Sequence, residues 1–234
     1  MFDDDGAMLN EKHTYRDLGL YIKSIRIAPP KPRVYKITVP GRDGCVDLSE
    51  INGGVTYENR SVEIVLNGKK EESAWIPFMS AFMNLYHGRT VKVIFDCDPS
   101  YYYIGRASVE ADFEKGVEVA CFTLALDADP YKYEVTSSLD DWLWDPFCFE
   151  TDIVREYKDM VVDGSRELVI PALRKRLVPV IYASSDMTVT FNGEIYTLAA
   201  GINKIYDISL PEGENVLIFT GHGTVSVDYR GGSL

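Results

Sequence analysis

The stretch Met187-Thr-Val-Thr-Phe191-Asn-Gly-Glu194-Ile-Tyr-Thr-Leu198 decides the fold class of the C-terminal part of the chain. Apolar and polar residues alternate before Asn192-Gly193, and a period of two is typical of a half-buried strand. Asn-Gly is the strongest short hairpin signal, because both residues of the favoured two-residue turn take positive φ. The stretch therefore predicts an antiparallel pair of strands, 187–191 and 194–198.

Further strand-like segments follow one another at similar spacing around this hairpin. Short strands separated by regular turns favour a β-sandwich such as a jelly roll. We place this predicted C-terminal domain at 164–234. Its other expected strands are 178–182, 204–208, 215–219 and 224–229.

The N-terminal part is also predicted to be mostly β. Pro29-Pro30-Lys31-Pro32 cannot donate to a ladder, so this segment is expected to be a stiff, exposed connection. Pro40-Gly41-Arg42-Asp43-Gly44 suits a tight turn and predicts a hairpin. The expected strands are 20–27, 34–39, 62–66 with a turn at Asn67-Gly68, 91–95, 101–109 and 117–126.

One helix is predicted, with its aromatic face on a sheet. Ser73 is a candidate cap, Pro77 is expected in the first turn and Gly88 is the expected stop. The predicted fold is therefore mainly β: an N-terminal β-sandwich or split barrel with one covering helix, and a C-terminal sandwich. The apolar residues that recur at three- and four-residue steps are Trp75, Phe78, Met79, Phe82, Leu85 and Tyr86.

The formal charge of −12, from 24 basic and 36 acidic side chains, is unevenly distributed. Residues 1–11 contribute −4 and residues 136–163 contribute −6, whereas 12–135 and 164–234 are each at −1. We therefore predict a compact domain at 1–135, an acidic connector at 136–163 and the C-terminal domain at 164–234. Residues 12–43 are locally basic, with eight bases against two acids.

Several classes of protein are disfavoured by composition. The acidic start differs from a secretory signal, and no stretch reaches the ~20 apolar residues of a membrane helix. The sequence thus predicts a soluble protein made in a cytoplasm, with no membrane partner. The four cysteines form no CxxC pair and are expected to be free and mostly buried: Cys45, Cys97, Cys121 and Cys148.

No residue is predicted to be catalytic, to bind a cofactor or to ligate a metal. His13, His87 and His222 belong to no recognisable catalytic motif, and His87 is expected to sit at a helix C-terminus. Asp96-Cys-Asp98-Pro99 offers two carboxylates to a cation, but a turn after a strand uses the same residues. The glycine pairs lack the helix and lysine of a phosphate loop.

Two binding interpretations remain open. Tyrosines are able to stack on sugar rings, although core packing explains them equally. The basic stretch 12–43 is able to meet phosphates, but its alternating charges favour a solvated or subunit-facing edge, and no specific nucleic acid is expected. The tyrosines concerned are Tyr101, Tyr102, Tyr103, Tyr182, Tyr196, Tyr206 and Tyr229.

The order of several short motifs resembles the distal tail proteins of long-tailed, non-contractile phages and their prophage relatives. In the N-terminal part these are Tyr15-Arg-Asp-Leu-Gly-Leu20, Val39-Pro-Gly-Arg-Asp-Gly44 with Leu48, and Tyr57-Glu-Asn-Arg60. The resemblance covers nearly the whole chain. It continues with His87-Gly-Arg89, Tyr102-Tyr-Ile-Gly-Arg106, Asp129-Pro-Tyr131, Trp144-Asp-Pro-Phe147 and Gly221-His-Gly-Thr-Val-Ser-Val-Asp-Tyr-Arg230.

The resemblance implies a structural hub of the virion tail tip and not an enzyme. Family members form hexameric rings through the N-terminal domain and join the tail tube to tail-tip or baseplate proteins, while a galectin-like sandwich projects outward. It implies assembly in the bacterial cytoplasm, with a homo-hexameric ring, tail tube protein and tail-tip or baseplate proteins as partners. Some members carry insertions that bind sugars or receptor-binding proteins, but the second domain here is short. The alternative function is a carbohydrate-binding module for host cell-wall glycan.

Overall fold

The computed structural model describes residues 6–51, 53–69, 72–111, 119–140 and 157–234. Contacts divide the chain into two compact units, Met1–Lys132 and Tyr133–Leu234. Within the described residues the protein is mainly β with one helix, which confirms the predicted fold class. The predicted domain boundaries stay predictions, and most of the proposed acidic connector lies outside the described residues.

The first unit is built on an antiparallel sheet in the order β2-β1-β7-β8-β9-β6-β3. Alternation places one face of each strand in the core: Val62, Ile64 and Leu66 of β6 are fully buried, as the sequence predicts. The bounds are β1 Ala7–Leu9, β2 Lys12–His13, β3 Leu20–Ile27, β6 Arg60–Lys69, β7 Thr90–Phe95, β8 Tyr101–Ala111 and β9 Val119–Ala128.

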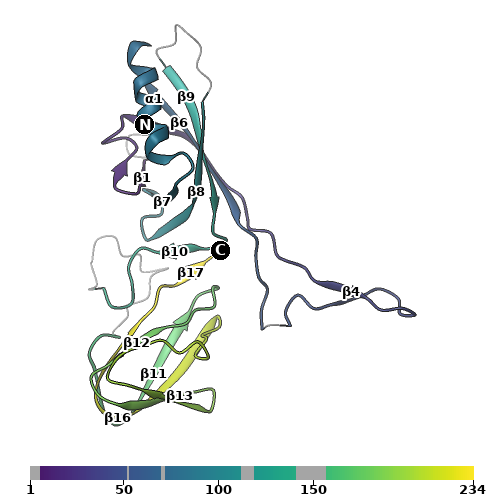
Figure 1. The fold of residues 1–234 in the computed structure, drawn as a ribbon, viewed down its shortest axis with the longest axis vertical. Coiled ribbons are helices and arrows are strands. Elements are labelled where there is room, and N and C mark those ends of the chain that lie inside the picture. Colours follow the sequence, from purple (N-terminus) through teal and green to yellow (C-terminus); the bar gives the residue numbers. More distant parts are fainter. Residues whose placement is uncertain (1–5, 52, 70–71, 112–118, 141–156) are drawn as a thin grey trace. The chain divides into compact units, whose positions relative to one another are not determined.

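The helix α1, Glu72–Tyr86, covers the core of this sheet (Figure 1). Its buried face consists of Trp75, Met79, Phe82 and Tyr86, at the three- and four-residue spacing that the sequence indicates. Leu85 is exposed, so its assignment to that face was wrong. The start also differs from the prediction.

The helix begins one residue before Ser73, so Ser73 lies inside it and is not its cap. Pro77 lies in the second turn, where its nitrogen cannot donate to the Ser73 carbonyl. Burial of the aromatic face therefore stabilises a helix that its proline disfavours. At the other end, Gly88 has a φ of 73°, which suits the predicted stop.

Between β3 and β6 the chain forms a segment that we call the arm, residues 31–58. Its base is closed by the bridge between Pro32 and Tyr57. Figure 1 shows the two sides of the arm ending in the hairpin of β4, Lys36–Thr38, and β5, Cys45–Asp47. The glycines of the predicted turn, Gly41 and Gly44, have φ of 79° and 78°. The predicted hairpin is confirmed.

The second unit contains a sheet in the order β14-β13-β16-β12-β15, with β11 also paired to β16. The Asn192-Gly193 hairpin joins β13 and β14 with the predicted bounds, and both turn residues have positive φ. The bounds are β10 Lys132–Glu134, β11 Met160–Ala172, β12 Val180–Ala183, β13 Met187–Phe191, β14 Glu194–Leu198, β15 Gly201–Asn203, β16 Gly213–Asp228 and β17 Gly232–Ser233.

Three details of the strand prediction were wrong: the break between 215–219 and 224–229, the strand at 204–208 and the turn at Asn67-Gly68. The strands expected at 215–219 and 224–229 belong to the single strand β16, and a Cβ at Gly221 would lie 2.7 Å from the Met187 Cβ, so this glycine permits close packing and not a turn. No strand forms at 204–208, because the Asn203 side chain bonds Ala199 and the chain turns after it. Likewise β6 runs through Asn67-Gly68 to Lys69.

Candidate functional site

The arm presents large apolar side chains to solvent. The exposed fractions are 54% for Val34, 55% for Tyr35, 51% for Ile37 and 72% for Ile51, and Val39 is also exposed. Single exposed apolar residues are ordinary on a protein surface, but a contiguous group marks an interaction site. The arm is therefore the candidate functional site of the first unit.

The sequence dictates why these side chains gather on one segment. Tyr35, Ile37 and Val39 recur with a period of two and so share one face of their side of the hairpin. Val46 lies directly opposite Ile37 on β5. A groove of about 680 Å³ on this segment is lined by Val34, Tyr35, Ile37, Leu48 and Ile51, with Arg33 and Lys36 beside them. We call this the arm groove.

Polar contacts hold the arm in shape. The Ser49 hydroxyl donates to Asp47 Oδ1 at 2.5 Å, and the Ser49 amide donates to the same oxygen at 2.9 Å. These hydrogen bonds lower the pKa of Asp47. The Tyr35 amide in turn donates to the Ser49 hydroxyl at 2.9 Å. The two sides of the hairpin are thus tied together although few of their side chains are buried.

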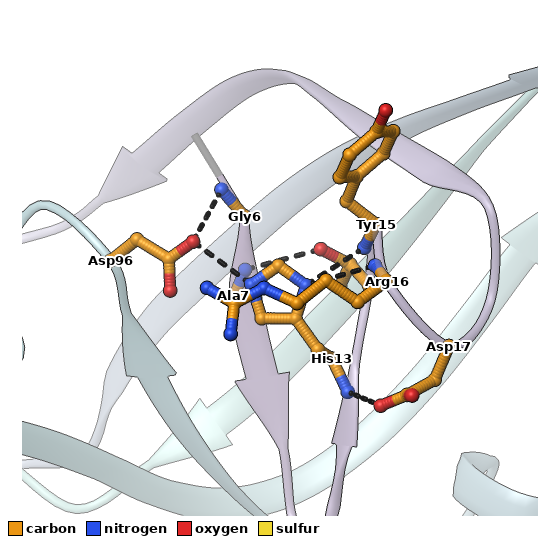
Figure 2. Close-up of polar contacts among 8 residues, drawn as sticks. Gly6, Ala7, His13, Tyr15, Arg16, Asp17 and Asp96 are labelled. Atoms are coloured by element: carbon orange, nitrogen blue, oxygen red, sulfur yellow. Dashed lines mark hydrogen bonds and ion pairs between the residues drawn. The ribbon is translucent and has the colours of Figure 1, made fainter. Parts of the chain in front are cut away.

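The three histidines do not meet in one site. His13 is buried in the first unit, and Figure 2 shows its contacts: the amides of Tyr15 and Arg16 donate to Nδ1 at 3.2 and 3.1 Å, so Nε2 carries the proton and donates to Asp96 Oδ2 at 2.9 Å. The Gly6 amide donates to the same carboxylate oxygen at 3.0 Å. These hydrogen bonds hold the chain around β1 and β2 against Asp96, the residue that follows β7.

His87 follows the end of α1, as predicted, and its Nδ1 accepts the Val109 amide at 3.0 Å. It therefore acts as an acceptor that ties the helix end to β8. His222 lies on β16. Its Nδ1 lies 2.9 Å from Asp163 Oδ1, and both side chains are largely exposed.

The two carboxylates of the possible cation site bind different groups. Asp96 accepts from His13 and Gly6, whereas Asp98 pairs with Lys132 at 2.7 Å. Within the described ranges, no cluster of three or more histidine, cysteine, aspartate or glutamate side chains is suited to a metal ion. None of the described helices is both long and apolar enough to span a membrane.

The predicted burial of the cysteines was wrong for the three that are described. Cys45, Cys97 and Cys121 are free and exposed. Cys121 alternates with the buried Phe122 on β9, so its side chain falls on the outer face of the strand. The fourth, Cys148, lies outside the described residues, as does the Trp144–Phe147 motif.

The tyrosines divide between core and surface. Tyr103 and Tyr229 are buried, and burial raises the pKa of Tyr103 although Arg60 acts in the opposite direction. Burial likewise lowers the pKa of Arg60. Tyr182 and Tyr206 of the second unit are exposed. Half-buried are Tyr101, Tyr102 and Tyr196.

Comparison with known proteins finds a solved structure of similar fold but no match to a protein family by sequence. The crystal structure of the Dit protein (gp 19.1) of SPP1, described as a paradigm of the hub adsorption apparatus in phages that infect Gram-positive bacteria, matches with a TM-score of 0.58. The match covers 97% of this chain and 99% of that one, at 13% sequence identity. No protein-family model matches the chain, and no curated protein matches its sequence.

The similarity concerns the fold, and it extends over both units. The arm groove was missed from sequence, because 34–39 was interpreted only as a strand of a hairpin. The sequence did contain a sign of this surface. The segment 34–39 lies between the proline-rich connection and the Pro40–Gly44 turn, both predicted to be exposed, so its apolar side chains have few core residues nearby against which to pack.

Proposed function

We propose that the protein is a structural component of a phage tail, a hub that assembles as a homo-hexameric ring and joins the tail tube to tail-tip or baseplate proteins. The observation that supports it most is the arm, whose apolar side chains are exposed in the single chain. The similarity in fold to the SPP1 Dit protein supports the same assignment. No catalytic role is proposed for any residue.

The physical argument for assembly is the cost of leaving the arm in water. Full burial of a valine, leucine or isoleucine side chain is worth about 1.5–3 kcal/mol. Because Val34, Ile37 and Ile51 are each more than half exposed, a neighbouring subunit has substantial apolar surface left to bury. Repetition of one such contact around a closed ring leaves no subunit with an uncovered arm.

The test is the size of the full chain in solution as its concentration is raised, measured by light scattering and native mass spectrometry. We expect hexamers, and we expect Ile51→Asp to shift the population to monomers. Ile202→Asp is the matched control, because Ile202 of β15 is 73% exposed and lies in the second unit. Monomers at every concentration, or equal effects of both variants, would contradict the proposal.

A carbohydrate-binding module is the second candidate, and exposed aromatic rings favour it. Tyr206 is 73% exposed and Tyr182 is exposed as well. Flat aromatic faces of this kind are able to stack on sugar rings. Cell-wall pull-down with the full chain tests this function: binding lost in Tyr206→Ala but kept in Ile202→Ala supports it, and unchanged binding in both variants argues against stacking through Tyr206.

A further inference from the structure

One exposed flank of α1 is a second surface with an unusual composition. From Ser73 to Tyr86 the helix carries no charged residue, in a chain that is 26% charged. Ile76 and Met83 are 76% and 41% exposed. With Ser80 between them, they are spaced at i, i+4 and i+7 and share one face of the helix. We call Ile76, Ser80 and Met83 the helix stripe.

A surface helix ordinarily places charged and polar residues opposite its buried face. In α1 the buried face is formed by Trp75, Met79 and Phe82. Each residue of the helix stripe follows one of these by one position, so the stripe lies about 100° around the helix from the buried face, on an exposed flank that carries no charge. The absence of charge there lowers solubility, and no contact among the described residues buries Ile76 or Met83. A covered position in an assembly explains it.

We infer that the helix stripe is the surface that receives the arm groove of a second copy of this chain. This inference rests on the proposed ring. Within one chain the arm and the helix stripe are both exposed, so an arm seated on the stripe belongs to another copy. The protruding Ile76 side chain enters the arm groove, where Tyr35 and Ile37 lie.

Charge favours this pairing over one with the exposed apolar residues of β3. The groove is flanked by Arg33 and Lys36, and the helix stripe places no cation against them. On β3, by contrast, the exposed Ile25 is two residues from Lys23 and next to Arg26, whose guanidinium lies 4.0 Å from the Glu63 carboxylate. A second cation in a contact of low dielectric constant repels the first, so β3 is the poorer receiver.

The geometry of the contact also fits a ring. The arm groove and the helix stripe are different surfaces, so each subunit offers one to the neighbour on one side and the other to the neighbour on the opposite side. Such heterologous interfaces close into rings when the rotation allows it, whereas a contact between identical surfaces produces a two-fold dimer. One contact of arm on helix therefore explains both exposed apolar surfaces.

Cross-linking between subunits tests the inference on the full chain. The native cysteines are replaced by serine, and Ile37→Cys and Ile76→Cys are introduced together. A short bismaleimide should then link chains into a ladder of covalent multimers. The matched control pairs Ile37→Cys with Ile195→Cys on β14, which is 70% exposed. Native mass spectrometry of the same samples before cross-linking reports whether the oligomer forms.

The outcomes separate the inference from the proposed function. Oligomers with a ladder for the Ile37 and Ile76 pair, and little for the control, support the inference. Oligomers without that ladder, or with a single dimer that Ile76→Cys alone also gives, overturn it and leave the ring proposal standing. Monomers before cross-linking overturn both.

A charge test gives a second, independent result. Ile76→Lys adds a cation opposite Arg33 and Lys36 and should weaken association about tenfold or more. Ile76→Glu loses the same apolar contact but gains attraction to those cations, so it should weaken association less. Equal effects of lysine and glutamate would contradict the arm groove as the partner of the helix stripe.

Discussion

The His13 cluster makes a specific prediction about stability. Asp96 Oδ2 accepts hydrogen bonds from the Gly6 amide at 3.0 Å and from His13 Nε2 at 2.9 Å. Asp96→Ala removes both hydrogen bonds and leaves the His13 N–H, on a side chain that is 5% exposed, without a partner. The first strand should therefore detach more easily from β7, its neighbour in the sheet.

The magnitude follows from the two bonds. A hydrogen bond to a charged group contributes about 1.5–3 kcal/mol, and water partly replaces those lost at Asp96, so we expect a loss of about 2–4 kcal/mol. The Asp96 side chain is 26% exposed, so water reaches this site only in part and replaces only part of the lost hydrogen bonding. Asp96→Asn keeps one oxygen acceptor and should lose about half as much.

Hydrogen exchange measured by mass spectrometry on the peptide that contains residues 6–13 is the assay. If β1 opens without the whole unit unfolding, Asp96→Ala should accelerate exchange about 30- to 800-fold. Asp98→Ala is the control, because Asp98 pairs with Lys132 at a partly exposed position and such pairs are worth about 0–1 kcal/mol. Equal acceleration in both variants would refute the reasoning.

Three further predictions concern the first unit. A Cβ at Gly105 would lie 2.3 Å from the Asp127 carbonyl oxygen, which belongs to the backbone, so Gly105→Ala should lower the free energy of unfolding by about 3 kcal/mol in urea titration. Burial raises the pKa of Tyr86 above the ordinary 10.0, so its contribution is full below about pH 10 and lost as the pH rises through the higher folded value; Tyr86→Phe should flatten the alkaline part of the stability profile, and an unchanged profile would argue against it. Reversing the charge of Lys31, Arg33 and Lys36 should change the salt dependence of assembly in light scattering, and an unchanged dependence would remove electrostatics from the contact without affecting the apolar argument.

Much of the fold was predictable because it depends on local pattern. The alternation in 62–66 and 187–191 is imposed by the strand period, and it places the same residues in the core that the structure buries. Asn192-Gly193 determines its turn through backbone geometry alone. These features need no knowledge of distant residues.

The errors arise where distant residues decide. Gly221 and Gly223 look like turn residues in sequence, but β16 continues through them because the chain around Ser184 and Met187 packs too close for a Cβ. In the same way, the pairing of Asn67 with Cys121 and of Gly68 with Ala120 keeps β6 extended through a turn-like dipeptide. Tertiary contacts override local preference at both places.

The candidate site was only partly predictable. The sequence located the hairpin and the basic stretch, but exposure of Ile37 and Ile51 depends on the absence of any packed layer against the arm. The uncharged run of α1 was visible in sequence and was interpreted through its buried face alone. Two exposed apolar surfaces on one unit become apparent only when the core has been assigned.

The central claim is that this chain closes into a ring through its first unit. Images of the full chain at high concentration, viewed down the symmetry axis by electron microscopy, test it most directly. We predict six-fold rings in which the arm of each subunit reaches its neighbour, and loss of these rings in Ile51→Asp. Particles that remain single chains, both in purified form and in assembled tails, would contradict the claim.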